Sequence, residues 1–172
     1  MTTPPTIRTE RLTIRPNRPE DFEAYAAFYA SNRALLRGGI KSRADAWIQF
    51  AAEIGHWSLR GYGFWAVEET ASGAYCGQVG LWNPEGWAAP EVGWLMMEGF
   101  EGKGYAYEAA VRSRAYAYET LGWDEVASCI ADGNDRSIRL AERMGARLRE
   151  RTPREGRPDH LVYIHPKPED TA

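Results

Sequence analysis

Apolar and polar residues alternate along several short segments of this chain, and each such segment predicts a half-buried β-strand. Residues 9–16 show the pattern first, with Leu12 and Ile14 facing one way and polar side chains facing the other. A more continuous apolar run at 91–97 predicts a strand that is buried on both faces. The other predicted strands are 64–69, 75–82, 125–131, 146–151 and 161–165.

Apolar residues at helical spacing predict two helices between the first and second strands. Pro19 is expected to open the first helix. Ser42 and Asp45 resemble a capping box that opens the second. The positions expected to face inward on these helices are Phe22, Tyr25, Ala26, Tyr29, Trp47, Ile48 and Ala51.

Two more helices are predicted later in the chain. The third follows strand 91–97 and carries apolar residues at Ala106, Ala109, Ala110, Ala117 and Leu121. The fourth is capped by Asn134 or Asp135 and stopped by Gly145, with Ile138, Ala141 and Met144 as its apolar stripe. The resulting order, β-α-α-β-β-β-α-β-α-β-β, predicts a mixed α/β fold (α+β).

Three glycines, Gly99, Gly102 and Gly104, crowd the connection between strand 91–97 and the third helix. Because glycine has no Cβ, the backbone can turn sharply here and approach a ligand closely. The free N–H groups of a new helix point outward together, with the positive end of its dipole behind them. The turn therefore predicts a pyrophosphate site built from backbone amides.

Two common phosphate motifs do not fit this turn. A P-loop needs Ser or Thr after its Gly-Lys, where Gly104 stands, and a dinucleotide fingerprint needs a third glycine where Tyr107 stands. Residues 101–106, Glu-Gly-Lys-Gly-Tyr-Ala, resemble instead the Arg/Gln-x-x-Gly-x-Gly/Ala motif of the GNAT acyl-CoA N-acyltransferases, with Glu101 in place of Arg or Gln. The longer string Gly-Lys-Gly-Tyr-Ala-x-Glu-Ala is similar to the ribosomal-protein N-acetyltransferase (RimJ/RimL-type) branch.

Two further segments resemble the same family. Residues 134–145 resemble its Asn-x-x-Ser motif and the Glu-Lys-x-Gly end of the following helix, with Arg143 in the Lys position. Residues 9–16 resemble the Thr-Glu-Arg-Leu-x-Leu-Arg opening of the RimJ/RimL branch. The resemblance covers about residues 6–165. It implies the GNAT fold: a single mixed central sheet of about seven strands with four helices, splayed between the fourth and fifth strands.

The resemblance also implies acetyl-CoA as cosubstrate. The pyrophosphate is expected at the glycine turn and the pantetheine arm along the preceding strand. The expected cofactor-binding residues are Trp94, Met96, Glu101, Gly102, Lys103, Gly104, Tyr105, Ala106, Asn134 and Ser137. Asn134 has a simpler interpretation as a helix N-cap. Glu101 places a carboxylate near phosphate, which is unfavourable unless the side chain points to solvent.

Acyl transfer to an amine requires that the amine lose a proton. Glu91, at the start of the central strand, is the candidate base, and an ordinary solvated carboxylate is the alternative. Many GNAT enzymes use a tyrosine acid where Ala141 stands, so the resemblance suggests Ser137 as the acid, unless its hydroxyl only bonds its own helix backbone. Glu108 is expected to brace the glycine turn. The histidines lie away from these motifs at His56, His160 and His165.

Bulk properties fit a single domain over 1–172, with disordered tails expected at 1–5 and 167–172. The net charge of −3 and a pI near 5.7 offer no basic surface for nucleic acid. No apolar run approaches the roughly 20 residues of a membrane span, and the N-terminus lacks a signal-peptide core. Cys76 and Cys129 lack metal-ligand spacing. We therefore expect a cytoplasmic monomer or homodimer without metal, nucleic-acid or membrane partners.

The expected function is acetyl-CoA-dependent N-acetylation of a primary amine. The alternatives are a catalytically silent acyl-CoA-binding regulatory module and a nucleotide-phosphate binder. Trp82 and Trp87 flank a loop that could form a wall of the acceptor cleft, although core packing accounts for most of the seven tryptophans. Glu85 and Glu91 favour a cationic amine. A protein N-terminus, an amino acid or polyamine, and an aminoglycoside-like molecule all remain open as acceptors.

Overall fold

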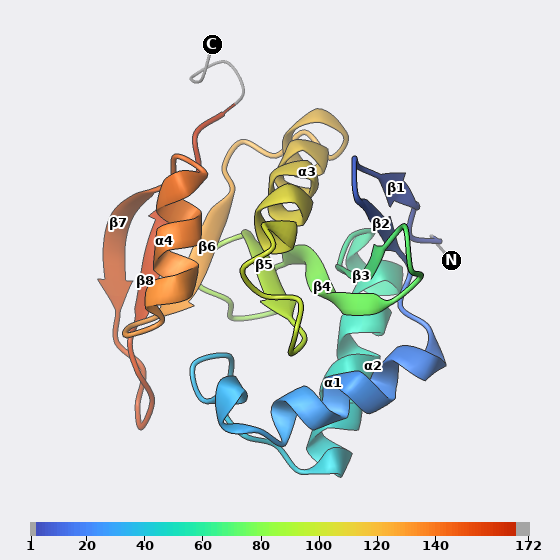
Figure 1. The fold of residues 1–172 in the computed structure, drawn as a ribbon. Helices are drawn as coiled ribbons and strands as arrows, with labels where there is room; N and C mark the ends of the chain where they lie inside the picture. The colour runs from blue at the N-terminus through green and yellow to red at the C-terminus, as the bar shows by residue number, and fades with distance from the viewer. Residues whose placement is uncertain (1–2, 168–172) are drawn as a thin grey trace.

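The computed structural model describes residues 3–167, which form one twisted sheet flanked by helices (Figure 1). The elements in chain order are β1 (Ile7–Arg8), β2 (Leu12–Arg15), η1 (Pro19–Asp21), α1 (Phe22–Tyr29), η2 (Asn32–Ala34), α2 (Arg43–Arg60), β3 (Phe64–Glu69), β4 (Tyr75–Trp82), β5 (Glu91–Met96), α3 (Tyr105–Glu119), β6 (Ala127–Ala131), α4 (Asp135–Arg143), β7 (Arg147–Thr152) and β8 (His160–Ile164). The strand order is β1-β2-β3-β4-β5-β6-β8-β7. Every neighbouring pair is antiparallel except β5 and β6, which are parallel.

The predicted mixed α/β architecture with four α-helices is confirmed. The sheet has eight strands in the described residues, where about seven were expected, because the two-residue strand β1 pairs with β2. Within the tail expected at 1–5, the Pro5 carbonyl accepts a hydrogen bond of 2.9 Å from Trp65 Nε1, so this end is attached to the sheet. Residues 1–2 and 168–172 lie outside the described part of the chain.

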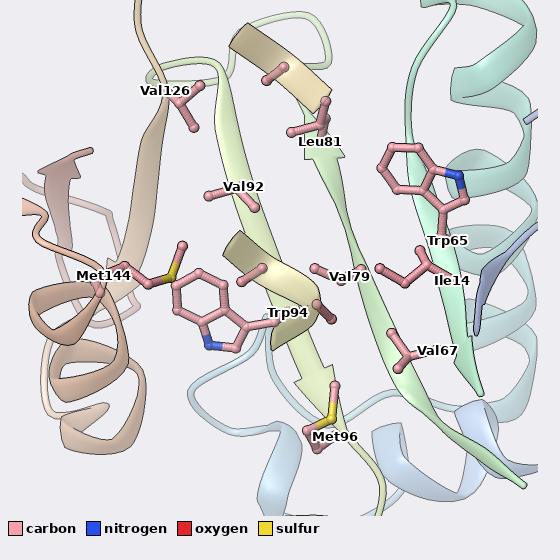
Figure 2. Packing of buried hydrophobic residues seen from close by; sticks show 14 of the residues in the cluster. Ile14, Trp65, Val67, Val79, Leu81, Val92, Trp94, Met96, Val126 and Met144 are labelled. Carbon is pink, nitrogen blue, oxygen red and sulfur yellow. The ribbon is translucent and has the colours of Figure 1, made fainter. Parts of the chain in front are cut away.

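Successive residues of β5 pack on opposite faces of the sheet. Trp94 and Met96 join the larger hydrophobic core, which α3 and α4 cover, and Figure 2 shows the Trp94 ring reaching from β5 toward Met144 at the end of α4. Leu95 and Met97 join a second core formed with α1 and α2. Even-numbered β5 side chains therefore face α3 and α4, and odd-numbered ones face α1 and α2.

The predicted splay lies between β5 and β6. These strands share a single register position, where Glu91 pairs with Ala127. Two residues further along β6, the Cys129 N–H donates to Glu91 Oε2 at 2.8 Å instead of to a strand carbonyl. The Val92 carbonyl accepts from Ser128 Oγ at 2.7 Å. Side chains thus replace the backbone ladder beyond this point, and the two strands diverge.

The predicted buried face of α2 was wrong. Trp47 and Ile48 are 53% and 66% exposed, and Ala51 is exposed too. The buried face is Ala46, Phe50, Glu53, His56 and Trp57. It includes Glu53 because this carboxylate accepts hydrogen bonds from Tyr25 Oη (2.9 Å) and Gln49 Nε2 (3.1 Å) inside the fold. Apolar spacing alone could not indicate that a glutamate would find such partners.

The predicted caps of α2 and α4 are confirmed. Ser42 caps α2 by accepting from the Asp45 N–H; Gly61, with φ of +79°, follows the last residue of α2, where no helix end was predicted from the sequence. Asn134 caps α4, and Gly145, with φ of +83°, follows its last turn. These are local interactions within a few residues, so they are legible in the sequence.

Candidate active site

A cavity of about 280 Å³ opens where β5 and β6 diverge. It contains four of the predicted site residues: Glu91, Trp94, Asn134 and Ser137. Because Glu91 faces α1 and α2 while Trp94 faces α3 and α4, the cavity connects the two sides of the sheet. The other predicted cofactor residues lie outside it, at the end of β5 and in the glycine turn: Met96, Glu101, Gly102, Lys103, Gly104, Tyr105 and Ala106.

Glu91 is 4% exposed, so it is not an ordinary solvated carboxylate at a strand end. Burial raises the pKa of its carboxyl group to about 7, against the lowering effects of the Arg37 charge and of the hydrogen bond from Cys129. A carboxyl group with a pKa near 7 can both accept and release a proton at neutral pH. Its position and its pKa fit a general base.

On the side of the splay, two β5 carbonyls accept hydrogen bonds from arginine side chains and not from a neighbouring strand. The Trp94 carbonyl accepts from Arg37 Nε at 3.4 Å, and the Met96 carbonyl accepts from Arg33 Nη2 at 2.7 Å. Both arginines come from the connection between α1 and α2. Since the strand pairs with β4 through alternate residues, these carbonyls face away from β4. They offer hydrogen-bonding groups to an extended ligand lying along the strand.

Ser137 lies in the first turn of α4, and its backbone N–H donates to Asn134 Oδ1 at 3.3 Å. Asn134 is therefore an N-cap, which was its simpler interpretation. Ser137 Oγ accepts from Trp94 Nε1 at 3.3 Å. An indole N–H can only donate, so the serine keeps its own O–H for another acceptor. Among the described residues, this hydroxyl bonds no carbonyl of its own helix.

The glycine turn presents free backbone donors. Gly99, Gly102 and Gly104 have φ angles of +85°, +73° and +82°, which side chains with a Cβ rarely adopt. Helix α3 begins after Gly104 without a side-chain cap, and within 3–167 no group accepts from the N–H groups of residues 105–107. Free amides at the positive end of a helix dipole attract anions, so the turn fits a pyrophosphate.

Glu108 ties the glycine turn to the start of the chain. Its carboxylate accepts from Thr9 Oγ1 (2.6 Å), the Arg11 N–H (2.9 Å) and Arg11 Nε (2.7 Å). Arg11 Nη1 in turn donates to the Lys103 carbonyl at 2.8 Å. Burial acts to raise the pKa of Glu108, but these bonds outweigh it and hold the pKa below its usual range. The predicted bracing role is confirmed, and it joins two motifs that are distant in the sequence.

Other side chains of the turn point away from a ligand role. Glu101 forms an ion pair with Arg33, and Arg136 Nη1 lies 3.7 Å away. These arginines neutralise the Glu101 carboxylate. From the sequence, a Glu101 side chain near phosphate was expected to have to point to solvent. Tyr105 has a buried side chain and Lys103 an exposed one. The turn therefore offers mainly its backbone.

Sequence reasoning missed much of the cavity lining, including Arg37, Cys129 and His160. Burial and the nearby Arg154 and Arg37 charges lower the pKa of His160 to about 4, so its neutral ring contacts Arg154 Nη1 at 2.7 Å. Burial and the Glu91 charge raise the pKa of the Cys129 thiol, which therefore stays protonated. Only the alternation along strand 125–131 could have placed Cys129 on the face of Ala127; the other two depend on tertiary packing.

The loop flanked by Trp82 and Trp87, predicted as a possible wall of the acceptor cleft, reaches the cavity only through these two tryptophans. The Glu85 side chain is fully exposed and lies 3.6 Å from Arg60 Nη2, so it does not reach the cavity. His56 is also outside the cavity, stacked on Trp82 with ring centroids 4.6 Å apart.

Comparison with known protein families identifies the family to which this chain belongs. The family described as "Acetyltransferase (GNAT) domain" matches residues 11–147, most of the chain. The chain belongs to the GNAT acetyltransferase family. It is 38% identical to an acetyltransferase from Agrobacterium tumefaciens str. C58 whose crystal structure superimposes with a TM-score of 0.89, covering 96% of each chain.

Curated relatives of this GNAT protein come from Bacillus subtilis (strain 168). "Putative ribosomal N-acetyltransferase YdaF" is 30% identical over 144 residues, 79% of this chain and 78% of the relative. "Uncharacterized protein YkkB" is 33% identical over 97 residues, and the match spans 52% of this chain and about half (56%) of that protein. The predicted resemblance to the RimJ/RimL branch is confirmed by this similarity.

Membership of the GNAT family makes acyl transfer the chemistry of this chain, and the family in general uses acetyl-CoA as cosubstrate. Within residues 3–167, no group of three or more His, Cys, Asp or Glu side chains is arranged to hold a metal ion. No helix in the described part of the chain is both long and apolar enough to span a membrane.

Proposed function

We propose that this GNAT protein is an acetyl-CoA-dependent N-acetyltransferase that acetylates a primary amine by direct attack in a ternary complex. The observation that carries the proposal is the buried Glu91 carboxyl group in a cavity that joins the two sides of the sheet. An acyl donor on the α3–α4 side and an amine on the α1–α2 side can meet there without crossing a strand.

Acetyl-CoA supplies the acetyl group as a thioester. The free amides at the start of α3 would hold its pyrophosphate, and the open backbone at Trp94 and Met96 would hydrogen-bond the pantetheine arm. Arg33 and Arg37, which cap those two carbonyls, would then give up these hydrogen bonds. Ser137 and Asn134 lie at the donor side of the cavity, where the thioester would end.

Glu91 removes a proton from the incoming ammonium group, which gives the neutral amine that attacks the acetyl carbon. The new C–N bond replaces the C–S bond, and the second proton lost by the nitrogen becomes available to the thiolate. Ser137 directs its free O–H toward the departing sulfur, since its oxygen already accepts from Trp94. Cys129 stays a protonated thiol beside Glu91, which supports direct transfer over an acetyl-cysteine intermediate.

Thiol release from acetyl-CoA with a library of primary amines tests this proposal. Glu91→Gln is expected to lower turnover by roughly 10² to 10⁴ at pH 7. The defect should shrink at high pH, where the amine loses its proton unaided. For the wild type, kcat/KM should rise with pH up to about 7, because Glu91 must be ionised to act as base. Glu85→Gln removes an exposed carboxylate from the neighbouring loop and should change neither value.

Two outcomes would contradict parts of the proposal. An equal loss of turnover in Glu91→Gln at every pH would mean that Glu91 positions the amine and does not remove its proton. Tight acetyl-CoA binding without thiol release across the whole library would favour the alternative function, a catalytically silent acyl-CoA-binding module.

A further inference from the structure

Basic side chains line the acceptor side of the cavity on two facing walls. Arg37 and Lys41 come from the connection that precedes α2, and Arg154 and Arg157 come from the connection between β7 and β8. Figure 1 shows these two connections approaching each other beside the lower ends of β5 and β6. Their charges also act on one another: Arg157 lowers the pKa of Arg154, after the larger effect of burial.

Of the four cations, Arg37 interacts electrostatically with the buried Glu91 and Glu53. Across residues 3–167, none of the four forms an ion pair within 4.0 Å. Arg154 contacts the neutral His160 ring instead. The two carboxyl groups in the lining are Glu91 and Glu53, so the four cations outnumber them even when both are ionised. The acceptor side therefore has a surplus of positive charge, although the chain as a whole carries −3.

We propose that the acceptor is a primary amine that also carries a carboxylate a few bonds from the nitrogen. The amine would lie at Glu91, and the carboxylate would be bound by Lys41, Arg154 and Arg157. This inference rests on the proposed acetyltransferase function and names its substrate class. It narrows the expected cationic amine, which rested on Glu85 and Glu91, to an amine that also carries a negative charge.

The location of the four cations separates them from the CoA phosphates. The free amides of the glycine turn lie at the start of α3, on the other side of the sheet, and residues 101–106 do not line this cavity. A volume of about 280 Å³ suits a small molecule or the first residues of a peptide. The carboxylate could belong to a free amino acid or to an acidic residue near a peptide N-terminus.

Matched amine pairs distinguish these sources. The first arm compares free L-amino acids with their amides; the second compares C-terminally amidated peptides with Asp or Asn as second residue. In at least one arm the acid should have about tenfold higher kcat/KM, the size of one charge-assisted contact. The ammonium group of the amide is the stronger acid, so at a given pH more of the amide than of the free amino acid is present as the reactive neutral amine. A preference for the free amino acid must therefore come from binding. Equal or better use of the neutral partners in both arms would overturn the inference while leaving the acetyltransferase function intact.

Variants tie the preference to the basic walls. The double variant Arg154→Gln/Arg157→Gln should bring the ratio of kcat/KM for the acidic and the neutral amine close to one. Arg157→Gln alone should lower this ratio about threefold or more. Because Arg157 is exposed, its replacement does not put folding at risk. Arg147→Gln removes the same charge from an exposed site on β7 outside the cavity and should keep the wild-type ratio. An unchanged ratio in the double variant, or a raised KM for acetyl-CoA in place of the acceptor, would refute the assignment. No thiol release with any amine would instead remove the proposed function, and this inference with it.

Discussion

At the scale of single residues, the environment of a side chain decides its chemistry. A glutamate ordinarily titrates near 4.3. Glu91 departs from this because it is buried at the point where the strand ladder ends, and this effect on its pKa exceeds the stabilisation of its charge by Arg37 and the Cys129 N–H. Ser137 owes its free O–H to Trp94, since the indole N–H occupies one of the hydroxyl's acceptor positions.

Ser137→Ala should slow acetyl transfer while leaving acetyl-CoA affinity nearly intact, because the backbone donors of the glycine turn remain. The variant also loses one hydrogen bond to Trp94, worth about 1 kcal/mol of unfolding free energy. The kinetic defect should shrink with an acyl donor whose thiol has a lower pKa, since that thiolate needs less stabilisation on departure.

Ser113→Ala is the matched control. This serine is buried in α3 outside the cavity, and its hydroxyl finds no hydrogen-bond partner among residues 3–167. Its replacement should leave turnover unchanged and should not destabilise the fold. A full-rate Ser137→Ala enzyme would leave water, or unassisted departure of the thiolate, as the means of completing the reaction.

At the scale of elements, α3 is held at its start by contacts that leave its amides free. An N-cap side chain would normally occupy one or two of the first N–H groups. Here Gly104 takes the capping position in a left-handed conformation, and the turn is fixed from behind by Glu108, Thr9 and Arg11. The helix keeps its order at the N-terminus while its anion-binding groups stay available.

Gly104→Val should weaken acetyl-CoA binding, measured by calorimetry or by the rise in Tm that the ligand produces. The new side chain would stand among the phosphate-binding amides, and its Cβ would lie 3.3 Å from Arg11 Nη2. The positive φ adds a cost of about 1–3 kcal/mol in stability.

Gly122→Val, at the other end of α3, separates these two effects. Gly122 also has a positive φ, +66°, but a Cβ there would meet open space. This control should lose stability to a similar degree and bind acetyl-CoA normally. Unchanged acetyl-CoA binding in Gly104→Val would mean that the pyrophosphate lies elsewhere.

At the scale of the whole molecule, the buried Glu91 links stability to pH. Its folded-state pKa of about 7 lies above the unfolded value. Below about pH 4.5 the carboxyl group is protonated in both the folded and the unfolded state, so it then takes nothing from folding stability. Folding stability is then lost as the pH rises from about 4.5 through 7, by roughly 3 kcal/mol in total.

Glu91→Gln cannot ionise and should escape this loss. Its Tm relative to the wild type should therefore rise by several degrees between pH 5 and pH 8. Glu85→Gln, at an exposed site, should follow the wild type throughout. Parallel melting curves for Glu91→Gln and the wild type across this range would show that Glu91 titrates normally.

The sequence by itself determined the order of the elements, the helix caps at Ser42 and Asn134, the glycine turn and the family. These features depend on neighbouring residues, because caps and turns are made within a few positions of the chain. The glycine turn itself predicted a pyrophosphate site, the carboxylate at the start of the central strand supplied the candidate base, and the resemblance to the GNAT family supplied the candidate acid.

Only the tertiary structure decided the buried face of α2 and the charge of the acceptor side. Whether Glu53 is buried depends on Tyr25 of α1, which α2 meets only after folding. The strand order β6-β8-β7 brings His160 and the β7–β8 connection to the cavity, where they face the loop before α2. Hydrophobic periodicity indicates which residues leave water, but the partners of a polar side chain are set by segments distant in the sequence, so the pairing of charges had to come from the fold.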